Sequence, residues 1–277
     1  MLGLTLKLTL VTTPIGNLGD ITENMRQAFV SCDLVLAEDT RVFRSLLSKL
    51  EIERSDLKVV SFNDHSQDRL KYFLDLIRSA QHPILVSDAG SPIISDPGHI
   101  LVKELINEGG EVTSVAGPSA VTVALELSGM APNPFCFYGF LPRKKGEISA
   151  KFQQAYQTNV TSLFFESPHR IHGTLEQLSQ EFPEAQVSVC RELTKKFEEC
   201  VRFKAQEFKT DLINAKGEFV LVVSWPKLEA GATASNEEFE KLAQNYLGKQ
   251  TPKNLAKLLS KITNRKTQEI YQELTSK

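Results

Sequence analysis

Residues 84–98, ILVSDAGSPIISDPG, decide how this chain folds. The stretch opens with Ile84–Val86, an apolar run of the length expected for a buried strand. After Asp88, glycines and prolines follow too densely for a strand or a helix to continue. We therefore predict a rigid loop at the carboxyl end of a parallel strand, which is where open α/β sheets hold their ligands.

This loop also carries polar side chains that a ligand could use. Two aspartates and two serines supply hydrogen-bond acceptors and donors, namely Asp88, Ser91, Ser95 and Asp96. The alternative is a tight connection in which these side chains only cap the next helix, but such a connection needs fewer of them. The composition of the loop favours a binding role.

Strand and helix patterns alternate along the first half of the chain. Five apolar runs read as strands, each followed by a helical segment: 8–13, 33–38, 59–62, 84–87 and 111–116. Thr22 suits the N-cap of the first helix, and Gly109-Gly110 suits the end of the fourth. Repeated alternation is typical of a parallel sheet with right-handed crossovers.

The second half follows a different pattern. Pro132 and Pro134 indicate a linker, and the strands after it are separated by less helix. Strands without crossovers suggest antiparallel pairing, so this sheet is expected to be mixed. The predicted fold class is α/β, with an N-terminal parallel-sheet domain (1–130), a C-terminal mixed-sheet domain (131–230) and a lysine-rich helical tail (231–277).

Composition limits the class of protein. A length of 277 residues favours two domains, and a net charge of −2 argues against a surface that is basic throughout. The four cysteines show no C-x-x-C spacing, which argues against a disulfide framework and fits a reducing cytoplasm; Cys136 and Cys190 are expected to be small core residues. No apolar run approaches the length of a membrane span. We predict a cytoplasmic protein that does not bind membranes.

Several familiar catalytic motifs are missing from the sequence. The first loop, TPIGNLGD at 13–20, matches neither the P-loop pattern nor G-x-G-x-x-G. The chain has no G-x-S-x-G elbow and no H-E-x-x-H motif. His169 and His172 form a lone i, i+3 pair, which is more often solvated or capping than metal-bound. No metal is predicted.

Three further stretches are candidates for chemistry. GPSA, at 117–120, lies at a helix N-terminus, where exposed amides suit an anionic group, although a plain turn is an equal reading. ESPHR (166–170) and RELTK (191–195) follow strands of the second half. For these two stretches, a salt-bridged helix start is the alternative to a functional role.

Seven stretches, taken in this order, resemble one family. They are TPIGNLGDIT (13–22), AEDTR (37–41), SDAGSPIISDPG (87–98), GPSA (117–120), GFLPRK (139–144), ESPHR (166–170) and RELTK (191–195). The resemblance is to ribosomal RNA small subunit methyltransferase I, in the tetrapyrrole-methylase-like class of S-adenosylmethionine (SAM) methyltransferases. Each motif is modest alone, but seven in order are highly specific.

The resemblance implies a fold and a reaction. It implies two α/β domains with SAM in the cleft between them, a homodimer, and 2′-O-methylation of a decoding-centre cytidine in small-subunit (16S) rRNA within the assembled subunit. Carried over by motif, the cofactor-binding residues are Pro14, Gly16, Asp88, Ala89, Ser91, Ser119, Ala120, Phe165 and Glu166.

The ESPHR stretch supplies the catalytic hypothesis. Glu166, His169 and Arg170 are predicted to face the substrate, with Glu166 or His169 accepting the proton. The sequence departs from the family at two places. Ser91 stands where the family often has threonine, and Asn63-Asp64-His65-Ser66 stands where it often has H-E-H-N, which puts a catalytic role for the first of those positions in doubt.

RNA contacts require local cations on this slightly acidic chain. Arg143, Lys144 and Lys145 follow Pro142 and are predicted to bind phosphate, with a solvated charge run as the alternative. In the tail, Thr251 and Pro252 suit a helix start. Lys253, Lys257 and Lys261 then share one face of this helix. Either this face docks on rRNA, or the helix is an ordinary packed helix whose lysines lie in water.

Two other functions compete with rRNA methylation. One is methylation of a tetrapyrrole or another small molecule, because a fold alone does not fix the substrate. GFLPRKK and the basic tail argue against it, since a small-molecule enzyme has little need of them. The other is a non-catalytic RNA-binding or assembly protein, against which the intact cleft motifs speak.

Overall fold

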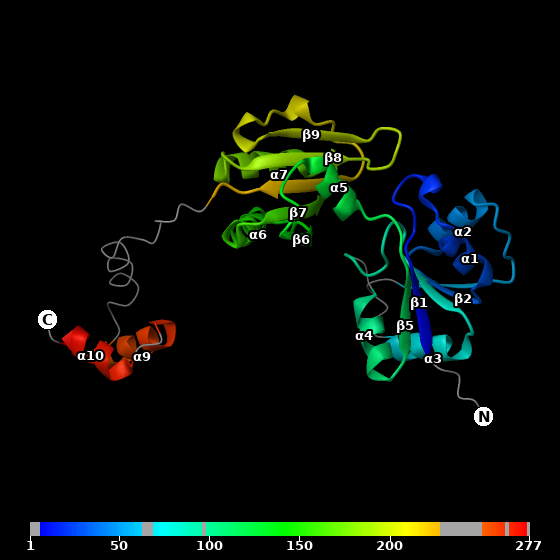
Figure 1. Ribbon diagram of the computed structural model, residues 1–277, viewed down its shortest axis with the longest axis horizontal. Helices are drawn as coiled ribbons and strands as arrows, with labels where there is room; N and C mark the ends of the chain where they lie inside the picture. Colours follow the sequence, from blue (N-terminus) through cyan, green and yellow to red (C-terminus); the bar gives the residue numbers. More distant parts are fainter. Residues whose placement is uncertain (1–5, 63–68, 96–97, 228–250, 264–265, 276–277) are drawn as a thin grey trace. The chain divides into compact units, whose positions relative to one another are not determined.

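The computed structural model describes residues 6–62, 69–95, 98–227, 251–263 and 266–275, and the chain forms two compact units, 1–226 and 227–277 (Figure 1). The first unit contains both predicted sheets. Within the described ranges, no helix is long and apolar enough to cross a membrane.

The first sheet is parallel throughout, as predicted. Its order is β3-β2-β4-β1-β5, and its strands are β1 (Lys7–Val11), β2 (Leu34–Ala37), β3 (Lys58–Ser61), β4 (Pro83–Val86) and β5 (Glu111–Val115). The central strands β2 and β4 are buried along their whole length, which explains their continuous apolar runs.

Helices cover both faces of this sheet. α1 (Glu23–Ser31) and α2 (Thr40–Lys49) share one apolar core with residues such as Val35, whereas α3 (Leu70–Ser79) and α4 (His99–Asn107) share another with Leu36. Thr22 caps α1, as predicted, and Asp39 caps α2. The neighbouring strands β1 and β4 therefore lead to helices on opposite faces, and such a switch point opens a crevice beyond the carboxyl ends of the strands.

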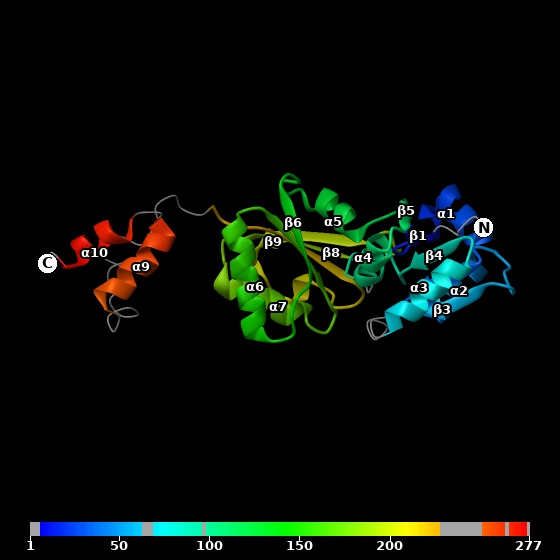
Figure 2. The same cartoon turned by 90° about the horizontal axis from the view of Figure 1, so that it is seen from below.

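The second sheet is mixed, as predicted. Its order is β6-β7-β10-β8-β9, with β6 and β7 parallel and the other neighbours antiparallel. The strands are β6 (Phe135–Phe140), β7 (Thr161–Glu166), β8 (Gln186–Arg191), β9 (Glu199–Lys204) and β10 (Phe219–Ser224). One face packs against α6 (Lys145–Thr158) and α7 (Ile171–Glu181), seen side by side in Figure 2. The first unit also contains short 3-10 turns at η1 (Leu18–Asp20), η3 (Ala205–Glu207) and η4 (Thr210–Leu212).

The other face of the second sheet is covered by α5 (Ala120–Ser128). Val121 and Ala124 pack with Leu163 and Val220, which belong to β7 and β10. We expected residues 1–130 to form the N-terminal domain, yet α5 lies within that range and packs on the second sheet. The helix thus links the end of β5 to the second half of the chain.

The C-terminal unit is a pair of helices. α9 (Pro252–Thr263) begins at Pro252, as the sequence predicted, and α10 (Thr267–Thr275) packs against it. Ala256 and Ile270 are buried in this pair, and Thr267 Oγ1 donates to Ser260 Oγ over 3.0 Å. The tail therefore has a small apolar core of its own.

Candidate active site

The loops after β1 and β4 are tied together at one point. Main-chain N–H groups of Thr13 and Gly90 donate to each other's carbonyls over 3.0 and 3.1 Å. The buried Thr13 hydroxyl donates to the Ser87 carbonyl over 3.2 Å. Gly90 has a φ of 80°, a conformation that favours glycine. These bonds hold the two stretches with predicted cofactor residues, 14–16 and 88–91, side by side at the switch point.

Carboxylates gather at the ends of β2 and β4. The Asp39 N–H donates to Asp88 Oδ1 over 3.0 Å, and the Asp88 N–H donates to Glu38 Oε2 over 3.3 Å. Hydrogen bonds from Arg41 lower the pKa of Asp39 to about 2, whereas partial loss of hydration and the negative charge of Asp39 raise the pKa of Asp88, although that residue is exposed. Glu38 and Asp39 were not among the predicted site residues, although AEDTR was one of the family motifs.

The N-terminus of α5 offers hydrogen-bond donors. Ser119 is the N-cap residue, but its side chain makes no capping hydrogen bond to the helix. The first turn of a helix has N–H groups without intrahelical partners, and these attract anionic groups. Ser119 and Ala120 are both half-buried, and α5 begins at Ala120, as the GPSA stretch predicted; a cofactor contact of these residues stays a prediction.

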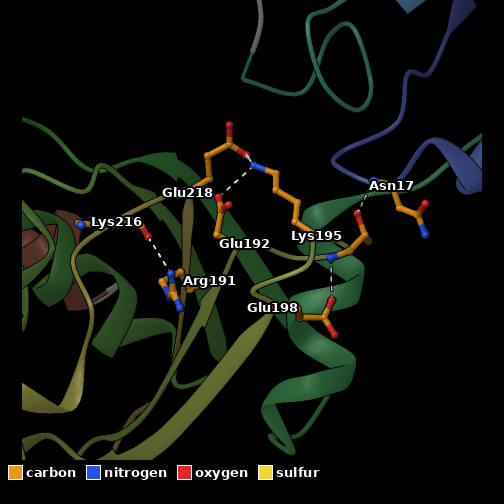
Figure 3. A network of polar contacts seen from close by, with 8 residues as sticks. Asn17, Arg191, Glu192, Lys195, Glu198, Lys216 and Glu218 are labelled. Carbon is orange, nitrogen blue, oxygen red and sulfur yellow. Dashed lines mark hydrogen bonds and ion pairs between the residues drawn. The ribbon is translucent and has the colours of Figure 1, made fainter. Parts of the chain in front are cut away.

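Gly16 lies where the first loop contacts the second half of the chain. The Asn17 N–H donates to Thr194 Oγ1 over 3.0 Å (Figure 3). A Cβ atom on Gly16 would lie 2.4 Å from Lys195 Cγ and 2.9 Å from Thr194 Oγ1. Only glycine fits this approach without a shift of the neighbouring turn. The structure thus gives Gly16 a packing role beside its predicted cofactor contact.

The RELTK stretch forms an ion-paired turn between β8 and β9. Lys195 Nζ lies 3.0 Å from both Glu192 Oε1 and Glu218 Oε2, and the Thr194 N–H donates to Glu198 Oε2 over 2.7 Å (Figure 3). Burial opposes the charge on Lys195, but the two carboxylates outweigh burial and raise its pKa. Glu192 and Thr194 have φ values of 51° and 64°, so the turn is strained and held by these bonds.

An apolar cluster connects the predicted cofactor residues of both halves. Its buried members include Ile15 from the first loop, Val121 from α5, and residues of β7, β8 and β10. Ala120 and Phe165 pack against it and are half-buried. Phe165 also makes edge-to-face contacts with Phe137 and Phe140, at centroid distances of 4.8 and 5.2 Å. The structure therefore brings the first loop, GPSA and Phe165 together.

Glu166 is fully enclosed by its own loop and by the start of α7. Its side chain is 0% exposed, and one carboxylate oxygen accepts from the Ser167 N–H (2.6 Å) and pairs with Arg170 (2.6 Å). The other oxygen accepts from the Thr174 hydroxyl over 2.7 Å. A carboxylate with both oxygens engaged and no exposed surface is poorly placed to accept a proton from a substrate. The geometry therefore favours a positioning role for Glu166.

Arg170 joins two predicted motifs. Its guanidinium donates to the carbonyls of Pro142 (2.8 Å) and Leu141 (3.1 Å), and to the Ser167 hydroxyl (3.1 Å). These contacts fix GFLPRK against ESPHR. His169 is exposed beside this corner, and within the described ranges its side chain has no hydrogen-bond or ion-pair partner. Of the three predicted catalytic residues, His169 is exposed, the Arg170 side chain is 27% exposed, and that of Glu166 is 0% exposed.

The predicted RNA-binding cations lie on the surface. Arg143, Lys144 and Lys145 are exposed at the start of α6, where Lys144 pairs with Glu147 over 3.1 Å. In the C-terminal unit, Lys253 and Lys257 are exposed one turn apart on α9. The side chain of Lys261 lies outside the described residues, as do His65 and Asp96.

Other possible sites are weaker. A depression of about 260 Å³ is lined by Lys7, Pro83 and Glu111, the first residues of β1, β4 and β5. It thus lies at the opposite end of the sheet from the loops described above. Across the part of the chain that the structure describes, no three His, Cys, Asp or Glu residues cluster as metal ligands would.

Comparison with known proteins defines the class. Residues 7–209 match the family described as "Tetrapyrrole (Corrin/Porphyrin) Methylases". Among solved structures, a diphthine synthase aligns with a TM-score of 0.64 and 17% identity, covering 86% of this chain and 95% of its own. The methyltransferase CobJ aligns with a TM-score of 0.59 and 16% identity, covering 80% and 96%. The chain belongs to the tetrapyrrole methylase family.

Closer relatives define the branch of the family. "Ribosomal RNA small subunit methyltransferase I" of Streptococcus pyogenes serotype M3 is 38% identical over 96% of this chain and 93% of its own length. The proteins of that name from Bacillus subtilis and Thermotoga maritima are 39% and 41% identical, over 78% and 79% of this chain and 74% and 98% of theirs. The chain is therefore a member of the ribosomal RNA small subunit methyltransferase I group.

Proposed function

We propose that this protein transfers a methyl group from SAM to the ribose 2′-hydroxyl of a decoding-centre cytidine in 16S rRNA. The observation that carries the proposal is the 38% identity to the S. pyogenes rRNA methyltransferase over 93% of that protein's length. A relationship of that extent includes both sheets and the loops between them. The predicted homodimer, the cytoplasmic location and the assembled small subunit as substrate belong to the same proposal.

The residues at the switch point fit SAM by their chemistry. Asp88 and Asp39 supply carboxylates for the ammonium group and the ribose hydroxyls, and the uncapped N-terminus of α5 supplies amides for the carboxylate. The apolar cluster around Ile15 and Phe165 suits the adenine ring. When bound, SAM supplies a methyl group on a positively charged sulfur.

Catalysis then rests mainly on alignment. A ribose hydroxyl is a weak nucleophile at neutral pH, and holding it in line with the methyl group lowers the barrier by several kcal/mol. We assign His169 to accept the proton late in the reaction, because its side chain is exposed in the loop that follows Phe165 of the apolar cluster. Glu166 and Arg170 hold the loop that carries His169.

Binding of rRNA is assigned to two groups of cations. The first group is Arg143, Lys144 and Lys145. Arg170 positions it by donating to the carbonyls of Leu141 and Pro142, the two residues that precede Arg143. Phosphate contacts of this kind set orientation rather than sequence. Lys253 and Lys257 on α9 are assigned to a second contact with rRNA.

The experiment is methyl transfer from radiolabelled SAM to three substrates in parallel: assembled small subunits, naked 16S rRNA and a tetrapyrrole precursor. We expect label in rRNA, and more in assembled subunits than in naked rRNA. Label only in the tetrapyrrole would replace this proposal with small-molecule methylation. SAM binding in calorimetry without label in any substrate would indicate a non-catalytic role.

A further inference from the structure

Cys190 and Cys200 lie directly opposite each other on neighbouring strands. They are paired residues in the antiparallel register of β8 and β9, and their Sγ atoms are 3.1 Å apart. Opposite residues in such a ladder have Cα atoms about 4.5–5.5 Å apart, within the range of about 4.4–6.8 Å that a disulfide spans. The sulfurs need to approach by about 1 Å to reach the bonded distance of about 2.05 Å.

Other contacts keep the two sulfurs facing each other. Cys190 Sγ lies 3.7 Å from the Ala124 carbonyl oxygen, and Cys200 Sγ lies 3.5 Å from the Leu127 carbonyl oxygen. Both carbonyls belong to α5. Ser188 Oγ lies 3.1 Å from Cys200 Sγ. The thiols are thus confined between the sheet and α5, with little freedom to turn apart.

The two thiols differ in their surroundings and therefore in their pKa. The hydrogen bond from Cys190, together with Ser188 and the charge of Arg202, lowers the pKa of Cys200, whereas the pKa of Cys190 is raised. Cys200 is half-buried on β9, the edge strand of the second sheet, whereas Cys190 is 0% exposed. A thiol of lowered pKa that directly faces a second thiol is the arrangement of oxidation-sensitive pairs.

We propose that Cys190 and Cys200 are an oxidation site, at which a hydroperoxide converts the two thiols into a cross-strand disulfide between β8 and β9. The Cys200 thiolate attacks one peroxide oxygen, so that an S–O bond forms, the O–O bond breaks, and the leaving hydroxide takes up a proton. Cys190 then attacks the sulfenic sulfur. The S–S bond forms as water leaves with the Cys190 proton, and two electrons have passed from the sulfurs to the peroxide.

The remaining cysteines provide internal comparisons. Cys136 is also half-buried, on β6, but makes no sulfur–sulfur contact with any cysteine in the described ranges. Cys32 is buried, and burial raises its pKa to about 11. Both should remain reduced under conditions that oxidise the pair.

The test uses the full chain treated with hydrogen peroxide, followed by alkylation, non-reducing digestion and mass spectrometry. We expect a peptide pair joined through Cys190 and Cys200, reversed by dithiothreitol, with Cys32 and Cys136 alkylated. In Cys190→Ser, Cys200 should accumulate as a sulfenic acid that dimedone labels. Cys136→Ser is the matched control and should leave the disulfide yield unchanged.

Two results would overturn the proposal. One is the absence of the linked peptide in the wild-type chain while Cys136 oxidises at an equal or greater rate. The other is a Cys200→Ser variant in which Cys190 is oxidised as fast as in the wild type. The wild-type experiment does not depend on the folding of any variant.

Discussion

The two halves of the candidate site contain similar residues but use them differently. In the loops after β2 and β4, Asp39 and Asp88 are held by the backbone and Asp88 remains exposed. In the corner after β7, Glu166 has no exposed surface, and the Arg170 guanidinium donates to Leu141, Pro142 and Ser167. Polar side chains at strand ends can therefore either face a ligand or hold a loop in place. The burial of the side chain distinguishes these two roles.

The largest expected effect is on stability, from breaking the Glu166 corner. Glu166→Ala leaves the Arg170 guanidinium without its partner, and loss of one member of such a pair costs about 3 kcal/mol. Chemical denaturation measures the change in the free energy of unfolding. His169→Ala is the matched control, with an expected change within about 0.5 kcal/mol. Equal stability of the two variants would contradict the positioning role of Glu166.

The next effect concerns the contact between the first loop and RELTK. Gly16→Ala places a methyl group 3.0 Å from the Leu193 carbonyl and closer still to Lys195, so overpacking should cost about 1–3 kcal/mol. Gly173→Ala on α7 is the control, because a Cβ atom there meets nothing within 4 Å. Thermal unfolding of both variants tests this, and a Gly16→Ala chain as stable as wild type would show that the loops are not held together here.

Methyl-donor binding should depend on Asp88 more than on remote carboxylates. Asp88→Asn removes a charged acceptor, and we expect at least a tenfold weaker Kd for SAM, equivalent to about 1.4 kcal/mol. Asp75→Asn, on the surface of α3, should leave the Kd unchanged. Isothermal titration calorimetry gives both values. Identical binding by the two variants would remove Asp88 from the cofactor site.

Surface cations should affect rRNA binding through its salt dependence. Arg143→Ala should lower the slope of log affinity against log salt by about 1, the contribution of one phosphate contact. Lys49→Ala on α2 is the control and should leave the slope unaltered. Filter binding of 16S rRNA over a range of salt concentrations measures this slope. If both variants keep the wild-type slope, Arg143 is a solvated charge that does not contact phosphate.

The smallest effect is a titration. The pKa of Asp88 is raised, so it binds a proton at a higher pH than an ordinary aspartate, whereas Asp39 stays ionised down to a pH of about 2. On lowering the pH, SAM affinity should therefore begin to fall above pH 3.8, the ordinary value for aspartate. In Asp39→Asn the midpoint should move down, because a neighbouring negative charge is gone. NMR titration of the Asp88 carboxyl in the wild type and in Asp39→Asn measures this midpoint. An identical midpoint in both proteins would contradict the coupling of the two aspartates.

Much of the fold follows from the sequence because strand and helix patterns are local. The buried runs at β2 and β4 and the cap at Thr22 appeared where predicted. The placement of α5 did not follow, because its apolar residues suit either sheet and only the tertiary structure selects one.

The site was less accessible to sequence reasoning. Motif order indicated which loops meet, but not that Glu166 is enclosed, since its partner Thr174 comes from the following helix. The closeness of Cys190 and Cys200 depends on the register of β8 with β9, and a shift of one residue would have separated them. Burial and register arise only from the assembled sheets.

The central claim is ribose methylation of small-subunit rRNA, and one measurement tests it directly. Small subunits are incubated with the protein and radiolabelled SAM, and the extracted 16S rRNA is digested with alkali. A methylated 2′-hydroxyl blocks cleavage of its own linkage, so we expect label in one alkali-resistant dinucleotide that begins with cytidine. Label released as mononucleotides would place the methyl group on a base and contradict ribose methylation.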